Sequence, residues 1–396
     1  MNILICNVGS TSLKYRLFAM DRGETVLARG GAERIGAPGS LFYSYGSDGA
    51  RREKALDLPT HREAIEEMLA QLRADGGEAA EAVSCVGFKV VLAKGITGVQ
   101  LLTDEVLRAM EDFSCVAPAH NPPYIAAIRQ FRELMPGVPL VGSFETAFHA
   151  NMPPEAYLYP IPLELSRKYG IRRYGFHGAS HEYITGRVSE LMGRRDLRLI
   201  SCHLGGSGSL AAVRSGVSID TTLGMSLQCG VIHNNRIGDM DPYIIFYLVE
   251  ECGMSLQEVK TLLQTKSGLY GLSGGLSNDL RDIEQAAEAG NEDARNAVAA
   301  YAYGVKKYIG AYAAALGGLD AIAFGGGIGR NSAAVRALAL SGLEAFGVCL
   351  DEAKNRTAAG DEDVSVPGSA VRIYLIDTNE ELVVARKALA LLKTQR

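Results

Sequence analysis

Two stretches of the chain, residues 3–17 and 199–213, repeat one design. In each, an apolar strand enters a short turn rich in glycine and hydroxyl side chains, and a second strand leaves it. Turns of this kind bring backbone N–H and side-chain O–H groups close to a ligand, which suits a phosphate group. Either stretch alone is equally typical of an ordinary hairpin. Because the design occurs twice, we predict a duplicated fold that binds one polyphosphate from both sides.

The size and composition narrow the class of protein. With 396 residues the chain exceeds the usual size of a single hydrophobic core, so we expect two domains. Hydrophobic residues make up 47% of the sequence and charged residues 21%, which is typical of globular proteins. The net charge of −5 gives no sign of a nucleic-acid partner, so any phosphate binding must be local.

Cysteine usage and hydropathy indicate the cellular compartment. The seven cysteines are scattered without a Cys-x-x-Cys pair, so we expect buried, reduced thiols and neither a disulfide framework nor a metal cluster. The N-terminus lacks a basic leader, and no uncharged apolar run reaches the roughly 18 residues of a membrane span. We therefore expect a cytoplasmic protein without a membrane partner.

The order of predicted elements indicates an α/β fold. Strand-like and helical patterns alternate, which is typical of layered sheets and helices. No abrupt change of composition marks a boundary, so we place it between residues 145 and 153, and the polar stretch 351–367 is the nearest match to a linker. The clearest strands are 82–91, 140–144 and 319–324, and the clearest helices are 61–75, 104–113, 123–135, 179–192 and 291–316.

A third phosphate-type element follows the strand 319–324. Its glycine run, Gly325-Gly326-Gly327-Ile328-Gly329-Arg330-Asn331-Ser332, leads into a helical pattern over 333–345. A strand, a glycine loop and a helix N-terminus together favour an anion, because unpaired N–H groups and the helix dipole face it. The run is neither a Walker A motif nor a Rossmann fingerprint, so alone it predicts either a nucleotide loop or a packing device.

The segment 172–181, Arg-Arg-Tyr-Gly-Phe-His-Gly-Ala-Ser-His, is the most distinctive in the chain. It resembles the second signature of the acetate and propionate kinase family, in which Thr usually replaces Ala179. The first signature of that family is similar to residues 7–14, Asn-Val-Gly-Ser-Thr-Ser-Leu-Lys. Five more family-like stretches follow in the expected order, at 117–122, 144–149, 236–242, 266–269 and 378–382. On these motifs the chain is identified as a member of the family from residue 2 to about residue 390.

The resemblance implies a fold and a division into domains. The family is similar to sugar kinases, Hsp70 and actin, so we expect an α/β chain of two duplicated actin-like ATPase (ASKHA) domains with an interdomain nucleotide cleft. The N-terminal acetokinase-like domain would comprise 1–146 and 382–396, and the C-terminal nucleotide-binding and dimerisation domain would comprise 147–381. The resemblance also implies a homodimer.

The implied reaction is phosphoryl transfer between ATP and a small carboxylate, which gives ADP and an acyl phosphate. It requires Mg²⁺, with Mn²⁺ as the alternative ion. The transferring group spreads negative charge over its oxygens, so the site needs cations, aligned donors and exclusion of water. By resemblance, Asn7 and Glu380 would hold the metal ion, directly or through water. The implied catalytic residues are His177, Arg236, Glu145 and Lys89.

The remaining implied site residues fall into two groups. One would bind the carboxylate, and the other would bind the phosphates and adenosine of the nucleotide. The carboxylate group comprises Lys89, Val91, Ala119, His120, Phe176, Leu227 and Arg236. The nucleotide group comprises Ser10, Ser12, Lys14, His203, Gly205, Gly206, Ser207, Gly208, Asp279, Leu280, Arg281, Gly326, Gly327, Ile328, Gly329 and Asn331.

Several of these residues also have a purely structural interpretation. His120, and still more His149 and His181, could be hydrogen-bonded histidines of the protein interior. Glu380 could simply be an acid favoured at a helix N-terminus. A structural role is less favoured for Arg236, which precedes a Gly-Asp-Met-Asp-Pro sequence.

The chain departs from the family at its reaction centre. Lys89 stands where relatives have arginine, which keeps the charge but loses the two-pronged donor geometry. Glu145 replaces an aspartate, and Gly206 replaces an asparagine in the second phosphate turn. Arg330 replaces a glutamate beside the adenosine loop.

Three functions therefore remain open. The first is a reversible acetate kinase. The second is a kinase of propionate or another short-chain acid, because Ala119 removes bulk from the implied acyl pocket while Leu227 adds some. The third is a weakly active nucleotide-binding paralogue, which the departures at Lys89, Glu145 and Gly206 favour. A pyrophosphate-dependent relative is less favoured, because the adenosine residues are kept.

Overall fold

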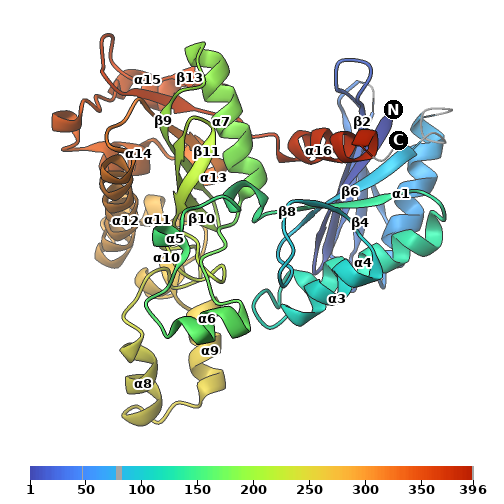
Figure 1. Ribbon diagram of the computed structural model, residues 1–396, viewed down its shortest axis with the longest axis horizontal. Helices are drawn as coiled ribbons and strands as arrows, with labels where there is room; N and C mark the ends of the chain where they lie inside the picture. The colour runs from blue at the N-terminus through green and yellow to red at the C-terminus, as the bar shows by residue number, and fades with distance from the viewer. Residues whose placement is uncertain (47, 77–82, 395–396) are drawn as a thin grey trace. The chain divides into compact units, whose positions relative to one another are not determined.

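The computed structural model of the chain describes residues 1–46, 48–76 and 83–394 (Figure 1). The chain forms two compact units. Unit 1 comprises Met1–Ala150 and Asn379–Arg396, and unit 2 comprises Asn151–Thr378. Ala82 of the predicted strand 82–91, and residues 395–396 of the predicted domain segment 382–396, lie outside the described residues.

Unit 1 is built on an eight-stranded mixed sheet. Its strands are β1 (Asn2–Gly9), β2 (Ser12–Ala19), β3 (Thr25–Glu33), β4 (Leu41–Tyr45), β5 (Arg51–Ala55), β6 (Val83–Val90), β7 (Val99–Leu101) and β8 (Leu140–Phe144), in the order β5-β4-β3-β2-β1-β6-β8-β7. The first five strands pair antiparallel with their neighbours. β1, β6 and β8 run parallel, and β7 closes the edge antiparallel.

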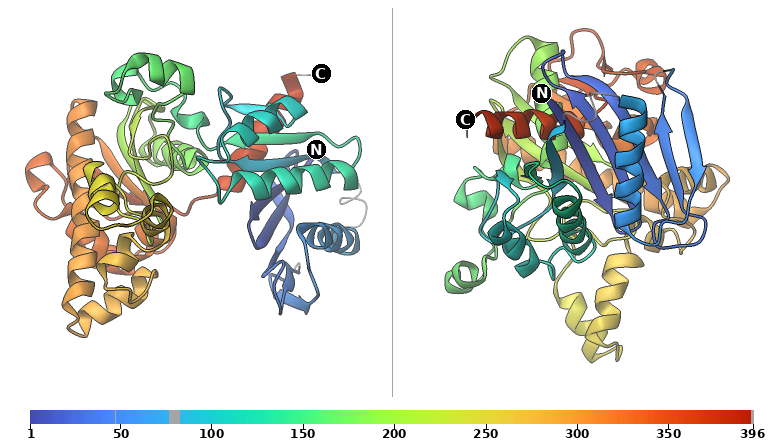
Figure 2. Two further views of the ribbon diagram at one scale, coloured as in Figure 1. Left: turned by 90° about the horizontal axis from the view of Figure 1, so that it is seen from below. Right: turned by 90° about the vertical axis from the view of Figure 1, so that its right-hand side faces the viewer.

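Helices cover both faces of this sheet, because both faces of β1 are apolar. Leu4 and Cys6 face one group of helices, whereas Ile3 and Ile5 face the C-terminal helix, as the alternation of side chains along a strand requires. Figures 1 and 2 show this three-layer arrangement within unit 1. The first group is α1 (His61–Gly76), α3 (Asp104–Asp112) and α4 (Asn121–Leu134), and the C-terminal helix is α16 (Glu380–Thr394).

Unit 2 is built on a six-stranded sheet with the order β11-β10-β9-β12-β14-β13. Its strands are β9 (Arg198–Leu204), β10 (Gly208–Arg214), β11 (Val217–Thr221), β12 (Ala321–Gly325), β13 (Glu362–Asp363) and β14 (Arg372–Leu375). β9, β10 and β11 pair antiparallel, whereas β9, β12 and β14 run parallel. The order β3-β2-β1-β6-β8 of unit 1 therefore recurs as β11-β10-β9-β12-β14, with the same strand directions. This recurrence confirms the duplication predicted from the two hairpins.

Helices also cover both faces of the second sheet (Figure 1). α12 (Glu292–Leu316) packs on one face with α11 (Leu280–Glu288) and α14 (Ala333–Leu340), and α7 (Gly178–Met192) packs on the other. α12 has clear ends, because the side chain of Asn291 caps its first turn and Gly317 ends it with a φ of +69°. The other helical segments are η1 (Ala147–His149) of unit 1, and α5 (Pro154–Tyr157), α6 (Leu163–Tyr169), α8 (Tyr243–Glu250), α9 (Leu256–Thr265), α10 (Gly268–Leu272), α13 (Gly326–Asn331), η2 (Glu344–Phe346) and α15 (Glu352–Thr357) of unit 2.

The structure corrects three local predictions. The glycine run is not a loop, because α13 begins at Gly326, and the guanidinium of Arg336 binds the carbonyls of Gly329 and Arg330 at its end. These tertiary hydrogen bonds outweigh the low helix propensity of glycine. The helix predicted over 333–345 ends at Leu340, and the stretch 351–367 is not a linker but contributes α15 and β13 to unit 2.

The structure also shows the state of the cysteines and the length of the apolar helices. All seven cysteines are free thiols, but only Cys6, Cys85 and Cys202 are buried. Cys229 and Cys349 are partly buried, and Cys115 and Cys252 are exposed. Among the described residues, no helix is long and apolar enough to cross a membrane.

Candidate active site

Three strands of unit 1 end at one edge of its sheet and carry polar side chains there. β1, β6 and β8 are parallel, so their carboxyl ends meet. Asn7 lies near the end of β1, Lys89 lies near the end of β6, and Glu145 follows β8 directly. The N–H of Glu145 donates to the carbonyl of Val90 at 2.8 Å, which fixes its position beside β6. The fold thus places these three predicted residues together.

Lys89 joins two carboxylates of this cluster. Its Nζ lies 2.5 Å from Oε2 of Glu380, at the start of α16, and 3.2 Å from Oε1 of Glu145. Burial acts to lower the pKa of Lys89, but the two carboxylates more than offset this and raise the pKa well above its usual value. Lys89 is therefore charged at neutral pH and forms ion pairs with both carboxylates.

The same cluster offers the oxygen donors that a hard divalent cation prefers. The hydroxyl of Tyr124 donates to Oδ1 of Asn7 at 2.6 Å, and Lys89 fixes Glu380. Two carboxylates beside one ammonium group leave net negative charge for a cation. The oxygens of Asn7 and Glu380 would therefore suit a hard divalent cation. The described residues contain no group of three or more His, Cys, Asp or Glu that could hold a metal ion by themselves.

The first hairpin turn, between β1 and β2, is short and exposed. Gly9 pairs with Ser12, so Ser10 and Thr11 form the turn. A Cβ at position 9 would lie 2.6 Å from Oγ of Ser12, so glycine allows this close approach. Ser10 and Lys14 are exposed, and Ser12 is partly buried. The predicted phosphate residues of unit 1 thus line one turn and the strand that leaves it.

His177 of unit 2 lies just before α7 in a conformation that is uncommon for a residue with a side chain. Its φ is +57°, in the left-handed region. Its Nδ1 is 2.8 Å from Oγ of Ser209, which also contacts Nε2 of His181 at 2.8 Å. Nδ1 of the fully buried His181 in turn contacts Oγ of Ser201 at 2.8 Å. This hydrogen-bonded chain fixes the orientation of the His177 ring and gives His181 a positioning role.

His203 lies near the end of β9, next to His177. The centroids of the two imidazole rings are 4.3 Å apart, at an interplanar angle of 35°. Oγ of Ser180 contacts Nδ1 of His203 at 2.7 Å. Each ring of the pair is therefore held by a serine through Nδ1.

A neighbouring loop holds the second hairpin turn, between β9 and β10. The turn comprises residues 205–207, one residue more than the turn of unit 1. The N–H of Asn234 donates to the carbonyl of Gly206 at 3.0 Å, and the N–H of Gly208 donates to Nδ1 of His233 at 3.0 Å. The predicted phosphate turn therefore depends on a loop that precedes Arg236 in the sequence.

Arg236 is a partly buried cation, and no described residue forms an ion pair with it. Burial lowers its pKa, and its Nε is buried without a hydrogen-bond partner among the described residues. Burial also lowers the pKa of His233 to about 3, with a further contribution from the charge of Arg236. His233 is therefore neutral, and a buried cation in these surroundings favours an incoming anion.

A cavity of about 410 Å³ opens beside the second turn. It brings together residues of the β9–β10 turn, the start of α11 and α13, all within unit 2. The predicted nucleotide residues that line it are Gly205, Gly206, Asp279, Leu280, Arg281, Gly327, Ile328 and Asn331. Sequence reasoning missed three further lining residues, Asn234, Glu284 and Ser332.

Asp279 and Arg281 form one structural unit at the start of α11. Asp279 caps the helix by accepting from the N–H of Arg281 at 3.0 Å, and it also accepts from the guanidinium at 3.0 and 2.5 Å. The side-chain hydrogen bond from Arg281 is the main reason that the pKa of Asp279 is lowered to about 2. Asp279 is thus ionised over the physiological range and available to a ligand hydroxyl at the cavity edge.

Several predicted residues lie away from this cavity. Gly326, Gly329, His203, Ser207 and Gly208 are in unit 2 but do not line it. Of the predicted acyl residues, Val91, Ala119 and His120 belong to unit 1, where Val91 is buried and Ala119 is exposed. Phe176 and Leu227 belong to unit 2, and both are buried.

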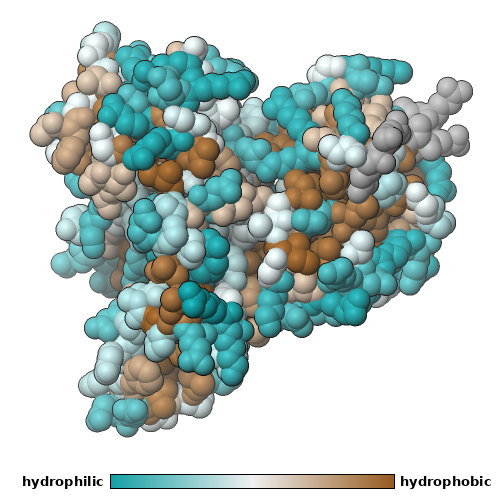
Figure 3. Space-filling view, viewed as in Figure 1, coloured by the Kyte–Doolittle hydropathy of each residue, from teal (hydrophilic) through white to brown (hydrophobic). Residues whose placement is uncertain are grey.

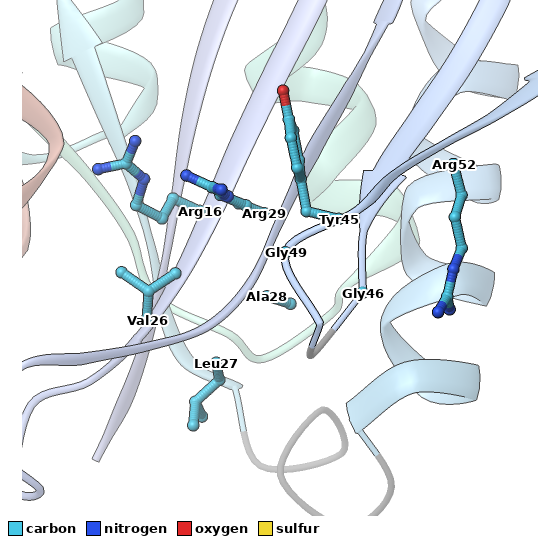
Figure 4. A pocket seen from close by; sticks show the side chains of 9 residues that line it. All are labelled: Arg16, Val26, Leu27, Ala28, Arg29, Tyr45, Gly46, Gly49 and Arg52. Atoms are coloured by element: carbon cyan, nitrogen blue, oxygen red, sulfur yellow. The ribbon is translucent and has the colours of Figure 1, made fainter.

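Unit 1 has a separate cavity of about 430 Å³ beside strands β2 to β5 (Figure 4). Arg16 and Arg29 are direct cross-strand partners there, and the guanidinium of Arg29 lies over the ring of Tyr45 at 4.2 Å. None of the predicted site residues lines this cavity. It is therefore not part of the candidate site.

Comparison with known proteins identifies the family. The model of the acetokinase family matches residues 2–386. The chain belongs to the acetokinase family. It is 43% identical to the acetate kinase of Methanosarcina barkeri over 405 residues, covering 100% of this chain and 98% of that protein.

Two solved structures of related kinases show the same fold. The acetate kinase of Porphyromonas gingivalis is 36% identical, with a TM-score of 0.90 and 99% of both chains covered. A propionate kinase from Francisella tularensis is 32% identical, with a TM-score of 0.90 and 98% of both chains covered. The predicted family and the α/β fold of duplicated actin-like domains are therefore confirmed.

Three of the residues that depart from the pattern implied by the resemblance, Arg330, Lys89 and Glu145, form ion pairs in the structure. Nε of Arg330 donates to Asp377 at 2.8 Å, and Arg330 does not line the unit 2 cavity, so this change adds an ion pair. Lys89 and Glu145 are changed together and contact each other. The carboxylate of Glu145 reaches the ammonium group of Lys89 at 3.2 Å.

Proposed function

We propose that this acetokinase is an acetate kinase, which transfers a phosphoryl group reversibly between ATP and acetate with Mg²⁺ bound. The family match over residues 2–386 and the full-length similarity to the acetate kinase of Methanosarcina barkeri support the reaction and the acceptor. The cavity between the glycine turn and the Asp279–Arg281 pair supports binding of the nucleotide in unit 2.

The chemistry of the reaction explains the kind of residues present. A carboxylate oxygen of acetate forms a bond to the γ-phosphorus of ATP, and the bond from this phosphorus to the β–γ bridging oxygen breaks. Acetate is ionised at neutral pH and ADP leaves as an anion, so no proton has to be transferred. The site therefore needs no general base, and its residues act by positioning anions and stabilising their charge. We accordingly assign Glu145 a positioning role through Lys89.

The buried, unpartnered Nε of Arg236 is the observation that carries the proposal. Its Nε lacks a hydrogen-bond partner among the described residues, and an anionic oxygen would supply one. A cation placed in low-dielectric surroundings stabilises charge that develops on a transferring phosphoryl group. His177, whose ring Ser209 holds at 2.8 Å, would donate a further hydrogen bond to the same group.

Unit 1 would supply the metal site. Asn7 and Glu380 would hold Mg²⁺, which when bound offsets negative charge on the phosphate oxygens. Tyr124 keeps the amide of Asn7 in place, and Lys89 keeps Glu380 in place. Ser10, Ser12 and Lys14 would line the approach of the phosphates on the first turn.

Trapping the acyl phosphate tests this function directly. The purified protein is incubated with Mg·ATP, hydroxylamine and acetate, propionate or butyrate, and the acyl hydroxamate is measured. We expect the highest kcat/KM with acetate, and loss of product when Mg²⁺ is chelated. A higher value with propionate would favour the second candidate, which the similarity to the Francisella tularensis propionate kinase supports. No acyl phosphate from a folded protein that still binds ATP would indicate the weakly active paralogue.

We also propose that the protein is a cytoplasmic homodimer joined through unit 2. α8 has no buried residue, and Tyr243, Phe246 and Tyr247 are each more than half exposed. Figure 3 shows hydrophobic surface over the part of unit 2 that carries α8 and α9. The free thiols fit a reducing compartment. Sedimentation should give a dimer that Phe246→Asp dissociates, and a wild-type monomer at micromolar concentration would contradict this proposal.

A further inference from the structure

Gly206 has no side chain, yet the space beside its Cα is occupied. A Cβ at this position would lie 3.3 Å from Nδ2 and 3.7 Å from Cγ of Asn234. The shorter distance is closer than an ordinary van der Waals contact. The carboxamide of Asn234 therefore packs against the place where a side chain at position 206 would begin, and both residues line the unit 2 cavity.

The backbone of Asn234 is fixed on two sides. Its N–H donates to the carbonyl of Gly206 at 3.0 Å, and its carbonyl accepts from the N–H of Tyr270 at 2.8 Å. Gly268 permits the second contact, because its φ is +63° and a Cβ there would lie 2.2 Å from the carbonyl oxygen of His233. The position of Asn234 relative to the β9–β10 turn is therefore set by the fold and does not depend on its own side chain.

The orientation of the carboxamide leaves its donor group available. Oδ1 of Asn234 is buried and has no hydrogen-bond partner among the described residues. Nδ2 makes no hydrogen bond to a described residue either, but it is not buried, and the residue borders the cavity. Packing thus holds an amide with its NH₂ group beside two glycines that let a ligand approach the turn closely.

We infer that Nδ2 of Asn234 donates a hydrogen bond to a phosphate oxygen of the bound nucleoside di- or triphosphate. By the family resemblance, relatives have an asparagine at position 206, and Asn234 would take over its role. A phosphate oxygen carries charge and accepts strongly from an amide N–H. This inference rests on the proposed nucleotide function of the cavity and identifies a residue that positions the phosphates.

Moving the amide back to position 206 tests the inference. Calorimetry with Mg·ADP and steady-state kinetics are compared for the wild type, Asn234→Gly, Gly206→Asn and the double variant. We expect Asn234→Gly to raise the Kd for ADP and the KM for ATP by about tenfold or more, with the KM for acetate nearly unchanged. Gly206→Asn should also weaken binding, because the new side chain meets Asn234. The double variant should return to within about threefold of the wild type.

Two further variants separate ligand contact from loop stability. Asn235→Gly puts the same flexible residue in the same loop, but Asn235 does not line the cavity, so ADP affinity should not change. Asn234→Asp keeps the size of the side chain and replaces the donor with an anion, so it should weaken ADP binding more than glycine does. Melting temperatures of all variants establish that each is folded.

The outcomes distinguish this inference from the function on which it rests. Wild-type ADP affinity in folded Asn234→Gly or Asn234→Asp would overturn the role of Asn234. An equal loss in Asn235→Gly would assign the effect to the loop, and a double variant weaker than either single variant would overturn the replacement of position 206. A wild-type protein that binds neither ADP nor ATP would instead overturn the proposed function.

Discussion

The two units use buried charge in opposite ways. In unit 1, Lys89 contacts the carboxylates of Glu145 and Glu380, which together raise its pKa despite burial. In unit 2, burial lowers the pKa of Arg236, and its Nε has no partner among the described residues. The sheets share the order of five strands, so the difference comes from individual side chains, such as Lys89 on β6, and from the loops around each sheet. One duplicated fold can therefore hold a lysine paired with two carboxylates in one unit and an arginine with an unpartnered Nε in the other.

The hairpin turns differ in a similar way. The turn of unit 1 is exposed, and the carbonyl of Gly9 contacts Nε2 of His61 at 2.8 Å. The turn of unit 2 has one residue more and is held by hydrogen bonds from Asn234 and to His233. We infer that the second turn keeps its shape before ligand binds, which reduces the entropy lost on binding.

Replacing Arg236 should give the largest effect on activity. Arg236→Ala should lower kcat by about a hundredfold or more, because one preorganised cationic donor is lost, and His177→Ala should cost a similar amount. The free energy of unfolding of Arg236→Ala should stay the same or rise, because a buried charge without a partner is removed. Acyl hydroxamate assays and urea unfolding measure the two quantities. Near-normal turnover in both alanine variants would break the contrast between the units.

Replacing Lys89 should act mainly on stability. Lys89→Met leaves two carboxylates without their shared cation, so the free energy of unfolding should fall by about 2 kcal/mol. The matched control is Lys54→Met, because the Lys54–Glu67 pair at 2.9 Å has a lysine that is 59% exposed and should contribute less than about 1 kcal/mol. Urea unfolding of both variants makes the comparison, and equal values for the two would contradict the account of unit 1.

The pH dependence of stability should come partly from His233. Its pKa is about 3 in the folded protein and about 6.5 when unfolded, so the unfolded chain takes up a proton first as the pH falls. This contribution is fully present above pH 6.5 and is lost as the pH falls toward 3. It amounts to about 1.4 kcal/mol between pH 7.5 and 5.5. His233→Gln should flatten the stability profile by that amount, and an unchanged slope would show that His233 does not titrate in this way.

The smallest expected effect concerns the choice of acid. One added methylene contributes about 0.8 kcal/mol, or roughly fourfold, where it fits an apolar site. Ala119 is exposed on unit 1, whereas Leu227 is 9% exposed in unit 2. We therefore expect the space for the extra methylene of propionate to lie at position 119. Ala119→Leu should therefore shift kcat/KM toward acetate over propionate, and Leu227→Ala should change the ratio less. A larger change in the ratio of kcat/KM values for Leu227→Ala than for Ala119→Leu would indicate that the acyl group contacts unit 2.

Much of the fold could be predicted because the sequence pattern and the structure depend on the same local physics. The apolar alternation of 3–17 and 199–213 predicts both hairpins, and the helix at Gly178–Met192 matches its periodicity closely. The glycine run at 325–332 was harder, because its helix depends on hydrogen bonds from Arg336, a residue outside the run. A local pattern contains no information about such a tertiary partner.

The residues of the site that lie in motifs could be predicted, but the residues that hold them in position could not. Lys89, Glu145 and Glu380 were identified from separate motifs, and the fold places them in contact. Asn234 and His233 were missed, because they act on a turn that is distant in the sequence. The signal available was their position in the His-Asn-Asn stretch directly before Arg236, where polar residues adjoin a predicted catalytic residue.

Chemical rescue of Arg236→Ala tests the central claim most directly, because it asks whether the site lacks only a guanidinium group. Acyl phosphate formation by the variant is measured while guanidinium chloride is raised through the millimolar range, well below denaturing concentrations. Lys89→Ala is treated in the same way. The account predicts that guanidinium restores the kcat of Arg236→Ala at least about tenfold and leaves Lys89→Ala unchanged. A folded Arg236→Ala variant that guanidinium does not activate would contradict the claim that Arg236 meets the transferring phosphoryl group.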